Sequence, residues 1–263
     1  MNYIITGGGA GMGLELTKKL LKEGHHIGLI VRNEQRKDET IDELGTDKLD
    51  FFFADLSDQS AVRQVASNIK AKWDHLDGLF NNAGVLLDKE YASKQDNEMH
   101  FEVNTLSPYL LTTELKPLLE AAENPFVVNT LTGGLHKRKL EVDSLKKPKK
   151  FVKLMGPYMH SKTALLLLMN NLSEKWPNVR IAGADPGPNK TKMTAGDGMP
   201  GWLLPIRNLL FPNPTKGAGK IYQTAFDSKF IDKTGIYVSG GKVVPVKPLL
   251  SEGEIDKILS NIN

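Results

Sequence analysis

Cysteine is absent from the 263 residues of this chain. The sequence therefore excludes disulfide bonds and thiolate metal ligands, and nothing else in it predicts a metal site. A chain of this length can bury enough apolar surface to fold without such cross-links. The lack of cysteine is also typical of proteins in reducing compartments, and we predict a cytoplasmic location.

Long hydrophobic runs are missing as well. The longest uninterrupted apolar run is Ala164–Met169, far shorter than the roughly 18 residues that a membrane-spanning helix needs. The chain also reaches a glycine-rich turn directly after a strand predicted at Asn2–Thr6, which leaves no room for a leader sequence. The sequence predicts neither a membrane span nor a signal peptide.

A strong excess of one charge is lacking too. The 34 Lys and Arg residues nearly balance the 31 Asp and Glu residues, for a formal charge of +3. Such a small excess does not suggest a nucleic-acid partner. One segment, Lys137–Lys150, has seven basic and two acidic residues, which would suit an acidic partner or a membrane surface. We favour a solvated insertion, because Pro148 interrupts the segment and its apolar residues form no clear amphipathic helix.

Short apolar runs alternate with amphipathic stretches along the chain. We predict strands at Asn2–Thr6, His26–Val31, Phe51–Phe53, Phe126–Thr130 and Arg180–Ala184, and helices at Leu14–Lys22, after an N-cap at Ser57, from about Asn97 to Ala122, and at Ser161–Trp176. Strands separated by helices are typical of βαβ units and a parallel sheet. The sequence predicts one α/β domain over residues 1–263, a Rossmann-type doubly wound sheet of about seven strands with helices on both faces.

The stretch Met193–Pro214 has a different composition. Glycine and proline residues interrupt large apolar side chains such as Trp202, Leu209 and Phe211. We interpret it as a mobile apolar flap over a substrate, because a second domain would need a more regular pattern.

A glycine-rich turn lies between the first predicted strand and the first predicted helix. Its pattern is T-G-x-x-x-G-x-G, and the strict G-x-G-x-x-G spacing is absent. Glycine lets the backbone approach a pyrophosphate closely, and the free N–H groups of the following helix favour an anion. We therefore predict a dinucleotide site that includes Thr6, Gly7, Gly9, Ala10, Gly11, Met12 and Gly13.

The end of the second predicted strand bears on which dinucleotide binds. An acidic residue there would favour NAD, whereas arginine accommodates the 2′-phosphate of NADP. This strand ends in Val31, Arg32 and Asn33, without a carboxylate. We predict NADP(H), with Arg32 and Asn33 at the site. NAD(H) is the alternative, for which Glu34 is the one nearby acid.

Several motifs together resemble those of the short-chain dehydrogenase/reductase family. After the glycine-rich turn come Asp55-Leu56, Asn81-Asn82-Ala83-Gly84, Asn104 within the long predicted helix, Tyr158 and Lys162 in a Y-x-x-S-K pattern, and Pro186-Gly187 followed by Thr191. Each motif is weak alone, but they occur in the family's order along nearly the whole chain. Phe101–Leu111 and Ile236–Pro248 look most similar to the retinol dehydrogenase-like branch, which reduces apolar carbonyls.

The resemblance implies a role for each of these residues. It assigns Asp55 to the adenine amino group, with Leu56 beside it, and places Asn81, Asn82, Ala83 and Gly84 around the adenosine ribose and the fourth strand. Pro186, Gly187 and Thr191 would hold the nicotinamide carboxamide.

The proposed chemistry depends on a tyrosine and a lysine. Tyr158 and Lys162 are four residues apart, so they share one face of a helix. A free tyrosine has a pKa near 10, and a nearby ammonium group lowers it. The resemblance assigns Tyr158 as the acid/base. Lys162 would lower the pKa of Tyr158 and hold the nicotinamide ribose.

The third catalytic position departs from the family pattern. The family usually places a serine where this chain has Thr132, whose hydroxyl can donate the same hydrogen bond. A one- or two-residue error in this correspondence would move the role to Thr130. Asn104 would complete the set through a water relay to Lys162.

These observations predict an NADPH-dependent oxidoreductase that acts on a small apolar carbonyl or alcohol. The alternative is a dinucleotide-binding sensor that acts through a protein partner, which the substitution at Thr132 would favour. Intact Tyr158 and Lys162 favour the enzyme. The apolar face of Thr163–Leu172 could form a homodimer or homotetramer interface, or it could be core.

Overall fold

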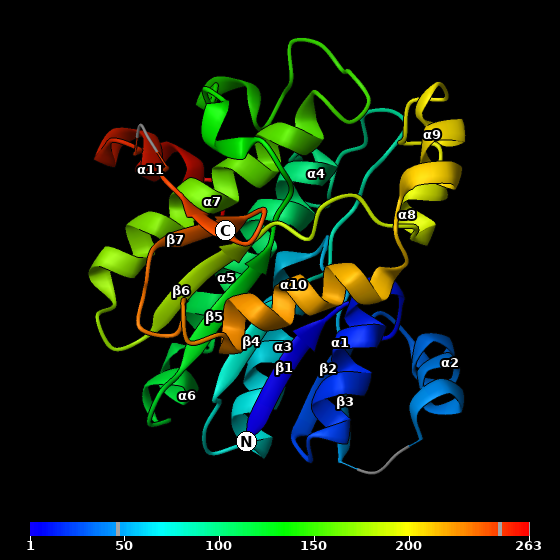
Figure 1. Ribbon diagram of the computed structural model, residues 1–263. Coiled ribbons are helices and arrows are strands. Elements are labelled where there is room, and N and C mark those ends of the chain that lie inside the picture. Colours follow the sequence, from blue (N-terminus) through cyan, green and yellow to red (C-terminus); the bar gives the residue numbers. More distant parts are fainter. Residues whose placement is uncertain (46–47, 247–248, 263) are drawn as a thin grey trace.

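The computed structural model describes residues 1–45, 48–246 and 249–262. Within this part of the chain, one eight-stranded sheet lies between two layers of helices (Figure 1). Its strand order is β3-β2-β1-β4-β5-β6-β7-β8. The strands are β1 (Asn2–Thr6), β2 (His26–Val31), β3 (Leu49–Phe53), β4 (Gly78–Asn81), β5 (Phe126–Thr130), β6 (Arg180–Ala184), β7 (Ile236–Ser239) and β8 (Lys242–Val244).

Helices and helical turns connect these strands. They are α1 (Gly11–Lys22), α2 (Glu34–Leu44), α3 (Gln59–Lys72), α4 (Met99–Phe101), the π-helical turn η1 (Glu102–Leu106), α5 (Ser107–Glu114), α6 (Lys116–Glu120), the 3₁₀ turns η2 (Leu135–Lys137) and η3 (Val142–Ser144), α7 (Pro157–Lys175), α8 (Lys192–Ala195), α9 (Leu203–Leu210), α10 (Pro214–Phe226) and α11 (Glu252–Leu259). No helix among the described residues is long and apolar enough to cross a bilayer.

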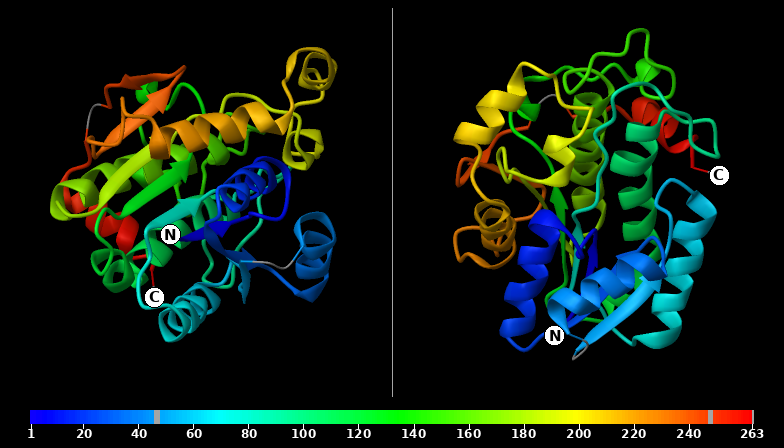
Figure 2. Two further views of the ribbon diagram at one scale, coloured as in Figure 1. Left: turned by 60° about the horizontal axis from the view of Figure 1, so that its bottom comes forward. Right: turned by 90° about the vertical axis from the view of Figure 1, so that its right-hand side faces the viewer.

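The helices form one layer on each face of the sheet (Figure 2). Helices α1 and α10 pack against each other on one face, over a core that includes Leu16, Phe80 and Ile221. Helices α3, α5 and α7 cover the other face, over a core that includes Val65 and Leu166. Burial of these apolar side chains is the main stabilising contribution to such a layered fold.

The predicted doubly wound α/β architecture is confirmed. Strands β1 to β7 pair in parallel, and the order reverses between β1 and β4, where adjacent strands lead their helices to opposite faces. The sequence analysis gave no strand range for β4 or β7, and it did not identify β8, which pairs antiparallel with β7 at the sheet edge. Gly240 and Gly241, both with positive φ, form the tight turn between β7 and β8.

Several predicted helix boundaries were wrong. Asp58, and not Ser57, is the N-cap of α3, because its side chain accepts a hydrogen bond from the Ser60 N–H. Helix α7 begins at Pro157, four residues before the predicted start, since proline is well tolerated in the first helical turn. The long helix expected from Asn97 to Ala122 is instead divided into α4, η1, α5 and α6. Two of these pieces, α5 and α6, carry proline in their first turn.

The apolar face of Thr163–Leu172 belongs to the core. Leu165, Leu166 and Met169 pack in the core beneath α7, and Ala164 and Leu168 pack in a second cluster with α11. This segment therefore offers no exposed face for an interface between copies. Of the segment Ile236–Pro248, the last two residues lie outside the described part of the chain.

The π-helical turn η1 is held by a buried carboxyl group. The two oxygens of Glu102 accept hydrogen bonds from Gln59 Nε2 at 3.0 Å, Ser93 Oγ at 2.9 Å and Asn97 Nδ2 at 2.7 Å. Gln59 and Asn97 also donate to the carbonyl oxygen of Asn261. This network ties η1 to α3 and to the segment after α11.

Glu102→Gln should destabilise the fold. The substitution keeps the size of the side chain but replaces one acceptor oxygen by an NH₂ group that faces other donors. We expect the free energy of unfolding to fall by about 1–3 kcal/mol, as when a buried hydrogen-bond donor is left without its acceptor. Urea denaturation measures it, with the exposed Glu120→Gln as the control. Equal stability of the two variants would contradict the role of the network.

Candidate active site

Three adjoining cavities lie at the carboxyl edge of the sheet, with volumes of about 460, 860 and 340 Å³. The first and second share Gly7 and Gly9, and the second and third share Asn82 and Gly84. They therefore form one continuous cleft across the point where the strand order reverses. In open α/β sheets this position binds ligands.

The glycine-rich turn forms the wall between the first two cavities. Gly11 has a φ of +52°, which side chains rarely allow. A Cβ atom on Gly13 would lie 2.1 Å from the carbonyl oxygen of Gly7, so only glycine lets α1 begin this close to the turn. The turn therefore exposes backbone with few side chains beside the N-terminus of α1. Such a site suits a pyrophosphate group. The residues present fit a dinucleotide.

Thr6 and Asn82 join the turn to β4. The Thr6 hydroxyl accepts hydrogen bonds from the N–H groups of Asn82 and Ala83, at 3.0 and 2.9 Å. The Asn82 amide in turn donates to the carbonyl oxygens of Thr6 and Gly7. Thr6 is buried beneath the cleft, so its side chain shapes the binding site from below.

The expectation that Asn81 lines the adenosine ribose is not supported. Its side chain is buried and donates to Thr112 Oγ1 and Asn129 Oδ1, each at 3.0 Å. It is not among the residues that line the three cavities. The physical reason is its position within β4, where its side chain points toward α5 and β5. Asn81 therefore stabilises the sheet beneath the site.

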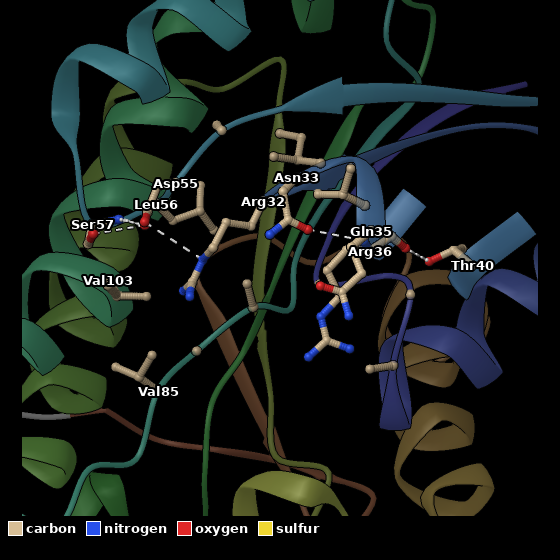
Figure 3. A pocket seen from close by; sticks show the side chains of 18 residues that line it. Arg32, Asn33, Gln35, Arg36, Thr40, Asp55, Leu56, Ser57, Val85 and Val103 are labelled. Atoms are coloured by element: carbon tan, nitrogen blue, oxygen red, sulfur yellow. Dashed lines mark hydrogen bonds and ion pairs between the residues drawn. The ribbon is translucent and has the colours of Figure 1, made fainter. Parts of the chain in front are cut away.

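The outer end of the cleft is lined by two arginines and an aspartate. Arg32 follows β2, and its Nε lies 3.7 Å from Asp55 Oδ2. Arg36 lies one turn into α2, pairs with Glu39, and extends its guanidinium group into the same cavity (Figure 3). Asn33 caps α2 by accepting from the Arg36 N–H. Sequence analysis identified Arg32 but missed Arg36. Arg36 follows the end of β2 closely enough for its side chain to reach the same cavity.

The carboxyl group of Asp55 is held in the charged form. Burial acts to raise its pKa, but hydrogen bonds from the backbone and hydroxyl of Ser57 and the charge of Arg32 outweigh that effect. The pKa of Asp55 therefore lies below its usual value. Asp55 presents an acceptor to the cavity at physiological pH. Other predicted residues that line the cleft are Ala10, Met12, Leu56, Ala83, Pro186, Gly187 and Thr191.

Tyr158 and Thr132 meet in the third cavity. Burial raises the pKa of Tyr158 to about 12, and the Thr132 side chain lowers it by a smaller amount. The net pKa of Tyr158 is thus set mainly by burial, and the lowering effect expected of Lys162 stays a prediction. Thr130 also lines the cavity, and its carbonyl oxygen accepts from Lys162 Nζ at 2.8 Å.

Lys162 lies one helical turn beyond Tyr158 on α7 and lines the same cavity. Burial lowers the pKa of Lys162 to about 8, because the low-dielectric interior disfavours its charge. The side chain is still mostly protonated at pH 7. Tyr158 is then a neutral proton donor beside a cation, a suitable arrangement for proton transfer to an oxygen.

Asn104 contacts the loop after β4 and helix α7, and its expected water relay to Lys162 stays a prediction. It lies in η1 and is fully buried, and its amide group bonds both the N–H and the carbonyl oxygen of Val85. It also donates to Ser161 Oγ at 3.2 Å. A Cβ atom on Gly84 would lie 2.9 Å from Asn104 Oδ1 and 3.3 Å from Lys162 Nζ. Asn104 therefore fixes the loop after β4 against α7, near Lys162 but outside the cavity wall.

The predicted flap supplies much of the third cavity's apolar wall. Met193, Met199, Leu203 and Phe211 all line this cavity. Arg207 of α9 donates to Thr194 Oγ1 and to the carbonyl oxygen of Thr191, which joins α9 to α8. The segment thus covers the side of the cavity that contains Tyr158.

Three further residues support the cavity and were not found by sequence analysis. The Tyr237 hydroxyl donates to the carbonyl oxygen of Thr132, and Asp185 accepts from Ser239 Oγ at 2.7 Å. Asn189 accepts from the Gly217 N–H and donates to the carbonyl oxygens of Pro186 and Gly187. The contacts of Tyr237 with Thr132, of Asp185 with Ser239 and of Asn189 with Gly217 join residues distant along the chain, so no local motif marks them.

Lys162→Met should stabilise the cofactor-free protein at pH 7. The folded state lowers the pKa of Lys162 from 10.5 to about 8, so a cost of about 3 kcal/mol for burying its charge is present in full below pH 8. Loss of the hydrogen bond to Thr130 offsets part of the gain, which leaves about 1–2 kcal/mol.

This gain should shrink between pH 8 and 10.5 and then reverse. Over that range the folded wild-type protein releases its proton before the unfolded chain does, so its own stability rises with pH. Urea denaturation at pH 7 and pH 10 measures the difference, with Lys175→Met at the exposed end of α7 as the control. A difference that does not depend on pH would contradict the assigned pKa.

Comparisons with known proteins identify the family of this chain. Residues 2–198 match the family model for short chain dehydrogenase. Polyprenol dehydrogenase from Danio rerio is 30% identical over 258 residues, covering 91% of this chain and 78% of that protein. Retinol dehydrogenase 11 from Mus musculus is 28% identical, covering 82% and 70% of the two chains.

Similarity to a solved structure supports the fold. The crystal structure of NADPH-bound carbonyl reductase from chicken fatty liver has a TM-score of 0.70 and 19% identity, covering 92% of this chain and 98% of that chain. The family match over residues 2–198 and the two relatives together establish the class of enzyme. The chain belongs to the short-chain dehydrogenase/reductase family, in its retinol dehydrogenase-like branch, and acts on CH–OH or C=O groups.

Proposed function

We propose that this enzyme is an NADPH-dependent reductase of small apolar ketones or aldehydes. The observation that carries the proposal is the convergence of Tyr158, Lys162 and Thr132 in one apolar-walled cavity, which adjoins the glycine-rich turn. The reverse reaction, oxidation of an alcohol, uses the same groups. The ratio of reduced to oxidised cofactor sets the direction.

The cofactor would extend along the whole cleft. Its pyrophosphate would contact the turn from Gly7 to Gly13, and its adenosine would lie toward Asp55 and Leu56. Arg32 and Arg36 would bind the 2′-phosphate, because two guanidinium groups in one cavity suit a dianion. When bound, the nicotinamide supplies the hydride that reduces the carbonyl carbon. Pro186, Gly187 and Thr191 would border it.

Tyr158 would donate the proton that completes the reduction. Its pKa of about 12 keeps the phenol neutral at pH 7, and the oxygen formed from the substrate carbonyl is a far stronger base. Thr132 would donate a hydrogen bond to the same oxygen and stabilise its developing charge. Lys162 would place a positive charge nearby, which favours the phenolate left after proton transfer.

An apolar substrate suits the lining of the third cavity. Leu86, Leu154, Leu203 and Phe211 contribute to a surface that a polar substrate would leave without hydrogen bonds. The flap from Met193 to Pro214 would close over this substrate and exclude water during the reaction. The similarity to enzymes named for retinol and polyprenol supports the same polarity.

The sensor alternative rests on the substitution of serine by Thr132, and no structural observation favours it. Thr132 keeps a hydroxyl in the cavity that Tyr158 also lines. We retain the cytoplasm as the proposed compartment, which the absence of cysteine supports.

Tyr158→Phe should abolish turnover and leave cofactor binding intact. The substitution keeps the ring and removes the proton donor, so we expect kcat to fall by about 100- to 10,000-fold. NADPH affinity, measured by fluorescence titration, should remain within about twofold of the wild-type value, since only the hydroxyl is lost. Activity is measured as NADPH oxidation with a panel of apolar aldehydes and ketones.

Tyr109→Phe is the matched control, because Tyr109 is a partly buried tyrosine of α5 outside the cleft. Full reductase activity in Tyr158→Phe would overturn the mechanism. Turnover of polar carbonyls in preference to apolar ones would overturn the proposed substrate class.

Arg32→Ala and Arg36→Ala should each reduce the preference for NADPH over NADH. Each removes a charge-assisted contact to the 2′-phosphate, so NADPH affinity should fall about 10- to 100-fold. NADH affinity should change less than about threefold, because NADH lacks that phosphate. Arg63→Ala, in a residue that pairs with Glu114 outside the cleft, is the control. Equal wild-type affinity for both cofactors would refute the assignment.

A further inference from the structure

The outer face of α9 is apolar, contrary to the usual pattern of a surface helix. Trp202, Leu209 and Leu210 are 71%, 81% and 69% exposed, and Leu204 and Ile206 are also exposed. The inner face already has its contacts, since Leu203 lines the third cavity and Arg207 bonds α8. We call these five exposed residues the α9 patch. Apolar exposure concentrated in this way marks an interaction surface.

A second exposed apolar group lies beside the α9 patch. Val152 and Met155 are 43% and 53% exposed, and Leu154 between them lines the same cavity as Leu203. The Lys153 ammonium group donates to the carbonyl oxygen of Asp197 at 2.8 Å, which joins the two segments. Seven of the 13 large exposed apolar side chains in the described part of the chain come from these segments.

Both segments lie at one end of the molecule, beyond the carboxyl edge of the sheet (Figure 1). The loop before α7 and the helix α9 occupy this end in the side view as well (Figure 2). The cavity that contains Tyr158 lies between them. The exposed apolar side chains therefore surround the mouth of the proposed substrate site.

The chain segments that contain these apolar side chains are also rich in basic residues. Residues 144–156 contain five lysines and no acid, and residues 186–220 contain five basic residues and one acid. These segments carry net charges of +5 and +4, whereas the whole chain carries +3, so the remainder is at −6. Lys147 contacts Asp96 at 3.5 Å, and Lys149, Lys150 and Lys153 are exposed. We call residues 146–153 the lysine segment.

We propose that this end of the molecule docks on an anionic lipid bilayer. The α9 patch would insert into the interface between headgroups and acyl chains, and the lysine segment would contact lipid phosphates and carboxylates. Apolar side chains next to lysines are the composition of interfacial membrane contacts. The arrangement places the mouth of the third cavity against the bilayer.

The position of the cavity's mouth favours a lipid surface, and not a protein, as the docking partner. This step rests on the proposed function, in which an apolar substrate enters through the mouth, because such a substrate concentrates in lipid. A protein bound over the α9 patch would cover that entrance. A second copy of the chain would bring two lysine segments together, and their like charges oppose that contact.

Vesicle sedimentation without cofactor or substrate tests the proposal. We expect the wild-type protein to bind phosphatidylcholine vesicles containing about one third phosphatidylserine at least tenfold more tightly than pure phosphatidylcholine vesicles. Leu209→Ser/Leu210→Ser should weaken binding to the anionic vesicles about tenfold or more. Lys149→Gln/Lys150→Gln should remove most of the preference for anionic lipid. The control Ile231→Ser/Val243→Ser changes exposed apolar residues elsewhere and should bind like the wild type.

Trp202 reports insertion directly. Its fluorescence should shift to shorter wavelength on anionic vesicles, and Trp202→Phe should remove that shift, since the change to an apolar environment occurs at this residue. No binding to either vesicle, equal loss in the control variant, or a dimer that Leu209→Ser/Leu210→Ser disrupts would each overturn the proposal.

One further measurement on the wild-type protein distinguishes a failure of lipid docking from a failure of the proposed reductase function. NADPH oxidation with a water-soluble short-chain aldehyde, measured without vesicles, tests the reductase alone. Turnover without vesicle binding would refute docking and leave the reductase in place. Vesicle binding without turnover of any carbonyl would support docking and refute the reductase.

Discussion

The junction between β1 and β4 is the contact on which the rest of the site depends. One hydroxyl, that of Thr6, accepts from two consecutive N–H groups, and the Asn82 amide donates back to the carbonyl oxygens of Thr6 and Gly7. The three cavities meet at this junction because the sheet reverses its order there. Cofactor end and substrate end are therefore held in one rigid frame, and neither could shift without breaking buried hydrogen bonds.

Burial changes the pKa values of both Tyr158 and Lys162, and these values determine what the two side chains can do in proton transfer. Both side chains are moved by desolvation toward their neutral forms, which leaves the phenol as a proton donor and brings the lysine pKa close to physiological pH. Helical spacing alone places the two residues on one face. Their protonation depends on burial in the surrounding core, which other parts of the chain supply.

Sequence patterns correctly predicted the features that interactions between neighbouring residues along the chain determine. The five strands predicted from apolar runs are present, and most of the predicted cofactor residues line one cleft. The errors concern features set by tertiary contacts. The helix expected from about Asn97 is interrupted where buried Glu102 and Asn104 take partners from other elements. Short β8 and the missed Arg36 carried only weak local signals.

The hydrogen bonds to the carbonyl oxygen of Asn261 have a consequence for synthesis of the chain. Its two donors, Gln59 and Asn97, precede it by 202 and 164 residues. A chain made from its N-terminus can pair β1 to β4 while still on the ribosome, but the network around Glu102 needs residue 261. The turn that carries Asn104 is then completed late, after the wall of the cofactor cleft has formed. The order of synthesis therefore separates the formation of this wall from the completion of the turn that carries Asn104.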